Sequence, residues 1–91
     1  MKVIYSPIRG ERSVKYEFGI DKVTAHLDGH QETFNFSGMP DGKAESITAD
    51  NLSVCPVVAA ERVDGELTVT LLHWYGADAE DWEKEQREET V

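Results

Sequence analysis

Two Asp-Gly pairs, Asp28-Gly29 and Asp64-Gly65, constrain the fold of this 91-residue chain more than any other feature. A two-residue turn of type I′ needs positive φ at both central residues, which Gly adopts freely and Asp tolerates. Each pair separates two β-prone runs, which are residues 23–27 and 30–36 for the first and residues 60–63 and 66–72 for the second. The sequence therefore predicts two β-hairpins and a mainly β fold.

The first hairpin can be tested for register. A turn at Asp28-Gly29 places Leu27 opposite His30 and Val23 opposite Phe34, and the apolar residues of both strands then fall on one face. A slip of one residue would turn them all to the other face. The predicted inner residues are Val23, Ala25, Leu27, Phe34 and Phe36.

The second hairpin passes the same test. A turn at Asp64-Gly65 pairs Val63 with Glu66 and places Val58 opposite Leu71. The inner face then gains the aliphatic stem of Arg62, whose charged end can still reach water. Its other expected members are Val58, Ala60, Leu67, Val69 and Leu71.

Two further strands are expected before the first hairpin. Lys2–Tyr5 is β-prone and is stopped by Ser6-Pro7, because proline cannot donate to a ladder. Val14–Phe18 alternates apolar and charged residues, which is typical of a half-buried strand. Residues 37–53 are rich in turn formers and cross between the hairpins, with either a short helical turn or an irregular connection at 47–52.

These elements predict one β domain over residues 1–76. We expect an antiparallel meander of five to six strands, forming a curled sheet or a small barrel-like sandwich. The acidic tail, residues 77–91, is expected to be a C-terminal helix, since Asp78 is a good N-cap and acids fill the first turn. Trp82 is the only large apolar residue from Asp78 to Thr90, so the helix would dock through it alone.

Charge and composition exclude several classes of function. The net charge is −9, and the segment from Asp78 to Glu89 carries seven acids and two bases, a net −5, so direct nucleic-acid binding is not expected. No apolar run is long enough to cross a membrane. The first residues lack the apolar region of a signal peptide, which predicts a cytoplasmic protein. Cys55 is the single cysteine, so it is expected to be a buried, inert thiol.

No residue pattern points to catalysis, a cofactor or a metal. Asp28 and Asp64 precede Gly at hairpin tips, where Asp serves the backbone. His26 and His30 would point to opposite faces of their hairpin, so they would not share a metal ion. The chain shows no nucleophile elbow, phosphate loop or dinucleotide motif. We therefore expect a protein that is not an enzyme and holds no cofactor.

Three aromatic residues are the candidate contact site for a protein partner. Trp74 and Tyr75 end the last predicted strand and point to opposite faces, and Trp82 follows in the acidic tail. One hypothesis is that the tail folds back and Trp82 covers this edge. The other is an exposed aromatic patch flanked by an acidic arm.

Two stretches of the chain resemble a family of small uncharacterised phage and prophage proteins. Residues 34–42 are similar to its "aromatic-x-Phe-Ser-x-Leu/Met-Pro-Glu/Asp-Gly" motif, and residues 61–72 to its "Glu-Arg-aliphatic-Asp-Gly-x-Leu-x-aliphatic-Thr-Leu" motif. The start of the chain and the Asp28-Gly29 hairpin are also similar, so the likeness covers residues 1 to about 76. The resemblance implies a role in the phage tail or its assembly and brings no catalytic residues.

The chain departs from this family after the last predicted strand. It reads His73-Trp74-Tyr75-Gly76 in place of a Pro-His-Gly-like ending, and then an acidic segment in place of a proline-rich tail. The leading hypothesis is a non-enzymatic protein that contacts a tail component, in the host cytoplasm or within the virion. The alternatives are an acidic, DNA-mimicking inhibitor of a host nucleic-acid-binding protein and a small-ligand-binding β-barrel. The oligomeric state stays open.

Overall fold

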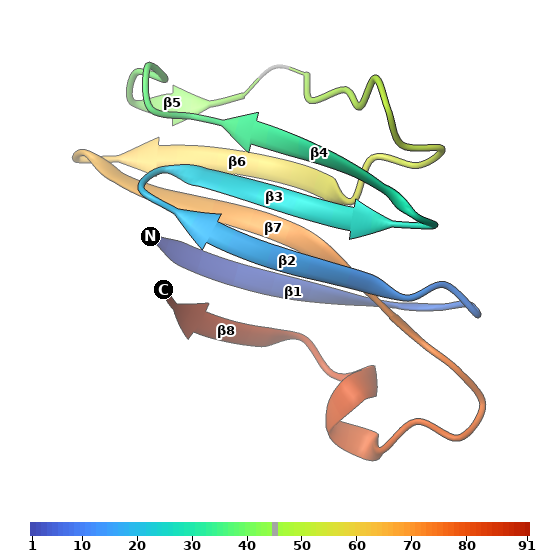
Figure 1. The fold of residues 1–91 in the computed structure, drawn as a ribbon. Helices are drawn as coiled ribbons and strands as arrows, with labels where there is room; N and C mark the ends of the chain where they lie inside the picture. The colour runs from blue at the N-terminus through green and yellow to red at the C-terminus, as the bar shows by residue number, and fades with distance from the viewer. Residues whose placement is uncertain (45) are drawn as a thin grey trace.

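The computed structural model describes residues 1–44 and 46–91, which form two β-sheets (Figure 1). The larger sheet has the strand order β5-β6-β7-β1-β8 and the smaller sheet the order β2-β3-β4. A single turn of 3₁₀ helix, η1, spans Asp81–Lys84. The strands are β1 (Lys2–Arg9), β2 (Val14–Gly19), β3 (Lys22–Leu27), β4 (His30–Asn35), β5 (Gly42–Lys43), β6 (Val57–Val63), β7 (Glu66–Tyr75) and β8 (Arg87–Thr90).

The hydrophobic core lies between the two sheets. Figure 1 shows β2, β3 and β4 layered over the larger sheet, with β8 at the far side of β1. Side chains alternate between the faces of each strand, so every second residue points into the core. The buried apolar residues are Val3, Tyr5, Val23, Ala25, Leu27, Phe34, Leu52, Val57, Ala60, Leu67, Val69 and Leu71.

The first predicted hairpin is confirmed residue by residue. Leu27 pairs with His30, Ala25 with Glu32, and Val23 with Phe34. Asp28 and Gly29 have φ values of 53° and 79°, as the turn chemistry requires. A second tight turn precedes this hairpin, where Asp21 also has a positive φ of 53° and joins β2 to β3. Local turn chemistry therefore sets the register of the whole small sheet.

The second hairpin is confirmed near its turn and corrected farther away. Val63 pairs with Glu66 and Ala60 with Val69, but the register shifts between Val57 and Ala59. Val57 therefore takes the inner position opposite Leu71, and Val58, predicted to be inside, is 50% exposed. A β-bulge of this kind adds one residue to one strand and reverses the faces beyond it.

The prediction of an all-antiparallel meander is wrong for the larger sheet. Strand β1 pairs with β7 in parallel and continues through Pro7 to Arg9, beyond the expected end at Tyr5. Proline is tolerated because the β8 ladder on the other side of β1 covers only Lys2–Tyr5. Within the described residues both sheets keep two edge strands, so neither closes into a barrel.

The predicted C-terminal helix is also wrong. The acidic tail forms only η1 and then β8, which pairs antiparallel with β1 from Lys2 to Tyr5. A helix over this segment would bury Trp82 alone, whereas β8 satisfies backbone groups that β1 would otherwise leave unpaired at a sheet edge. Of the two expectations for residues 47–52, the irregular connection is confirmed, and Leu52 anchors it in the core.

The positive φ of Gly29 generates a prediction about stability. Replacing Gly29 with Ala forces a side chain into left-handed backbone and should lower the free energy of unfolding by about 1 kcal/mol. Gly38→Ala is the matched control, since a Cβ there meets open space without a positive φ. Chemical denaturation of both variants measures the difference. Equal stability for the two would contradict the assigned turn.

Candidate functional site

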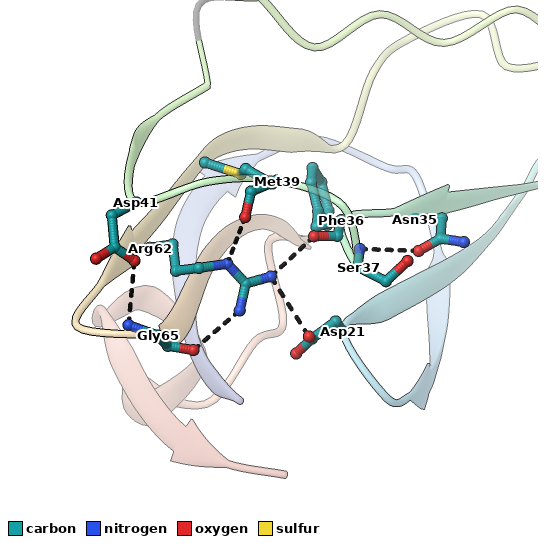
Figure 2. Close-up of polar contacts among 8 residues, drawn as sticks. All are labelled: Asp21, Asn35, Phe36, Ser37, Met39, Asp41, Arg62 and Gly65. Atoms are coloured by element: carbon teal, nitrogen blue, oxygen red, sulfur yellow. Dashed lines mark hydrogen bonds and ion pairs between the residues drawn. The ribbon is translucent and has the colours of Figure 1, made fainter.

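The guanidinium of Arg62 is the most highly connected polar group in the described structure (Figure 2). Its Nε donates to the carbonyl of Met39 at 2.8 Å, and its Nη1 to the carbonyl of Gly65 at 2.9 Å. Its Nη2 donates to the carbonyl of Phe36 at 2.8 Å and lies 3.4 Å from Oδ2 of Asp21. The side chain is only 11% exposed, so the charge is almost fully enclosed by its partners.

Arg62 joins segments that are far apart in the sequence. Its acceptors lie in the β2–β3 turn, in the loop after β4 and in the β6–β7 turn, and Figure 2 shows them surrounding one side chain. Asp41 adds a second tie, because its Oδ1 accepts from the backbone nitrogen of Gly65 at 3.1 Å. The donors of Arg62 are used within the chain, which gives this cluster a structural role.

The two stretches quoted for the family resemblance meet at this cluster. Phe36, Met39 and Asp41 belong to the first stretch, and Arg62 and Gly65 to the second. The order and spacing of the two stretches are therefore tied to one packing arrangement, in which both meet around Arg62. The sequence alone indicated a role only for the aliphatic stem of Arg62. No local sequence pattern predicts the three carbonyl groups that accept hydrogen bonds from its guanidinium.

The aromatic residues proposed as a contact site occupy three different settings. By strand alternation Trp74 shares a face with Thr70 and Leu72, while Tyr75 falls on the opposite face. Trp74 is partly buried and packs close to Gly10. Trp82 is 52% exposed and lies against His73 and Arg87. The tail does fold back, and Trp82 meets two residues that the sequence did not single out.

Arg87 is the centre of this second cluster, which we call the C-terminal clasp and define as Tyr5, His73, Trp82, Glu83 and Arg87. The guanidinium carbon of Arg87 lies 4.6 Å from the ring centre of Tyr5 and 4.9 Å from that of Trp82. A guanidinium between two aromatic faces is attracted by both rings. The clasp therefore fixes the start of β8 against β1.

His73 is the titratable member of the clasp. Its ring stacks on Trp82 with centres 6.4 Å apart, and its Nε2 lies 3.8 Å from Oε1 of Glu83. Burial lowers the pKa of His73 below its ordinary value, and the positive charge of Arg87 adds to this effect while Glu83 opposes it. Burial also raises the pKa of Tyr5.

The outer face of the larger sheet carries a shallow groove of about 300 Å³. Its floor follows one row of the ladder, in which Ala59 pairs with Thr70 and Thr70 with Ile4. Val58 stands beside this row because of the bulge in β6. The groove is lined by Ile4, Lys43, Ala44, Val58, Ala59, Ala60, Glu61, Thr68 and Thr70.

The remaining polar candidates have local structural roles. Asp28 sits at positive φ and accepts a hydrogen bond from Arg12 at 2.8 Å, and Asp64 has the same backbone conformation. His26 faces Glu17 at 3.4 Å. Cys55 is partly buried, donates to the carbonyl of Val57, and burial raises its pKa. Among the described residues, no three His, Cys, Asp or Glu side chains converge as metal ligands would.

Comparisons with protein-family models, with curated proteins and with solved structures found no match for this chain. No helix in the described part of the chain has the length and apolar character needed to cross a membrane.

The enclosure of Arg62 predicts a large effect of its removal. Arg62→Ala leaves three carbonyls without their donor, two of them in partly buried bonds, and should lower the free energy of unfolding by about 2–4 kcal/mol. Arg12→Ala is the matched control, because Arg12 makes an exposed ion pair whose loss should cost less than about 1 kcal/mol. Urea denaturation distinguishes them. A similar loss in both variants would contradict the anchoring role.

The setting of His73 predicts a pH dependence. Because its pKa is lower in the folded than in the unfolded chain, the unfolded chain binds more protons as the pH falls below the ordinary value of 6.5. The stability that neutral His73 contributes is thus complete above pH 6.5 and declines as the solution becomes more acidic. His73→Gln should flatten this part of the curve measured by denaturation between about pH 5 and 7.5. Parallel curves of stability against pH for wild type and His73→Gln would refute the role assigned to His73.

Proposed function

We propose that this chain is a non-enzymatic phage or prophage protein that acts through protein–protein contacts in the tail or in its assembly. The resemblance of residues 1 to about 76 supports the phage context. The observation that carries a contact role is the open outer face of the five-stranded sheet, with its groove and exposed apolar side chains.

This face is less polar than an ordinary solvent-facing sheet surface. In a two-layer fold, the residues of each strand that face solvent are normally polar, and they alternate with apolar residues that face the core. Here Val58 is 50% exposed and Ile8 is 40% exposed, and the central row of Ala59, Thr70 and Ile4 carries no charge. An uncharged strip bordered by charged groups such as Lys43 and Glu61 is typical of a protein contact surface.

The shape of the groove favours a protein partner over a small molecule. Small-molecule sites enclose most of their ligand, whereas this groove lies open on a sheet face. The space between the sheets is occupied by the core side chains. A flat, shallow surface on a rigid sheet matches the geometry of standard protein interfaces.

The acidic tail gives less support to the inhibitor hypothesis than its composition suggested. Glu88 lies 3.5 Å from Lys2, and Glu83 contacts His73, so part of the charge is engaged within the chain. The segment is also part of the sheet through β8. A partner for the tail charge would have to bind a segment that the fold already uses.

Two valines on β6 provide the test. Val58→Glu places a charge in the groove, and Val63→Glu places the same charge at a position of similar exposure near the hairpin tip. A photo-crosslinking residue at position 70 should capture a phage structural protein in lysate of induced cells, and Val58→Glu should reduce that capture by about tenfold or more. Val63→Glu should leave it unchanged.

Two outcomes of this crosslinking experiment would contradict the proposal. Capture of a host nuclease or transcription protein in place of a phage component would favour the inhibitor hypothesis. Equal capture by wild type and Val58→Glu would exclude the groove as the contact surface.

A further inference from the structure

Strand β8 is attached to the molecule along one edge only. It pairs with four residues of β1, from Lys2 to Tyr5, while β1 pairs with β7 along its whole length. The residues of β8 are Arg87, Glu88, Glu89 and Thr90, and glutamate has a low preference for strands. The strand therefore stays in place through its partners on β1 and through the clasp.

The interactions that hold β8 form a short and self-contained set. Beyond the ladder they are the stacking of Arg87 on Tyr5 and Trp82 and the ion pair of Lys2 with Glu88. The terminal residues add two bonds, since Val91 donates to the carbonyl of Met1 at 3.0 Å and the Met1 ammonium to that of Val91 at 3.2 Å. Each of these partners is present, in the same arrangement, on any second copy of the chain.

The connection before β8 is long enough to reach a neighbouring molecule. Residues 76–86 contain a glycine at position 76 and the single turn η1. Fully extended, these eleven residues span about 35 Å, which exceeds the two shorter dimensions of the protein, 27 and 21 Å. Straightening this connection would release η1 from His73 and carry β8 away from the β1 edge of its own chain.

We propose that β8 exchanges between two copies of this chain, so that each copy's β1 edge takes the other copy's C-terminal strand. Reciprocal exchange of an identical element re-forms the ladder of β8 on β1, the Lys2–Glu88 ion pair and the stack of Arg87 on Tyr5, and it gives up only the contacts of η1, which makes it a low-cost route to a dimer. The receiving surface is the β1 edge from Lys2 to Tyr5, and the clasp residue Arg87 docks on Tyr5 of the other copy. The proposal does not depend on the groove or on the tail partner.

Paired cysteines test the exchange directly, because Lys2 and Thr90 are opposite each other in the ladder. Cross-strand Cα separations of about 4.5–5.5 Å suit a disulfide. In a Cys55→Ser background, Lys2→Cys and Thr90→Cys are made as two separate variants, mixed at high concentration and mildly oxidised. Exchange predicts a disulfide-linked heterodimer on a non-reducing gel. Mixing Lys2→Cys with Thr24→Cys, on the outer face of the small sheet, measures random collision.

A single chain carrying both Lys2→Cys and Thr90→Cys completes the design. It should close its own disulfide as a monomer, which confirms the register of β8. Exchange is refuted if this chain closes while the mixed variants link no more than the collision control. Failure of the double variant to close would refute the pairing of β8 with β1, and with it the proposal.

The clasp provides a kinetic readout. Opening of the clasp is required before exchange, so Arg87→Ala should speed the appearance of the mixed disulfide by about tenfold. Lys84→Ala, which changes an exposed cation of the same segment, should leave the rate unchanged. Equal rates for the two variants would show that Arg87 does not hold the strand closed.

Discussion

The almost fully enclosed guanidinium of Arg62 connects the parts of this fold that local sequence does not connect. The three carbonyls that accept from Arg62 come from Phe36, Met39 and Gly65, so a single side chain fixes the loop after β4 against the β6–β7 turn. Asp21 brings the β2–β3 turn to the same point. Most other contacts between the two sheets are apolar and non-directional, and the hydroxyl of Tyr16 in β2 donates to the carbonyl of Leu72 in β7. Arg62 therefore supplies, together with Tyr16, the directional element in how one sheet sits on the other.

The second constraint is the edge of β1 that β8 covers. An aliphatic edge strand with unpaired backbone groups is a template for pairing with another chain. Here the edge is covered by a strand rich in charged residues, in which Glu88 forms an ion pair with Lys2 and Arg87 stacks on Tyr5. The acidic tail thus has a structural use that its composition alone does not indicate. Its charge remains outward while its backbone completes the sheet.

The sequence was sufficient wherever the determining chemistry is local. Asp28-Gly29 and Asp64-Gly65 fix both hairpin turns, and the alternation of apolar residues fixes the register around them. The bulge at Val58 and the parallel pairing of β1 with β7 were missed, because each is settled by partners distant in sequence. The contacts of the candidate site were missed for the same reason. Trp82 could be selected as an isolated aromatic residue, whereas its contacts with His73 and Arg87 follow from the fold alone.

The position of β8 changes how the role of the acidic tail can be examined. Removing residues 77–91 would remove charge, Trp82 and an edge strand together, so loss of activity would not distinguish charge mimicry from exposure of β1. Exchanging exposed acids for amides, for example at Glu80, Glu85 and Glu89, changes charge while leaving the backbone pairing and the Arg87 stack in place. A function that depends on the tail charge should follow these exchanges, whereas a function of the outer sheet face should not. This comparison shows whether the tail acts through its charge or through its place in the sheet.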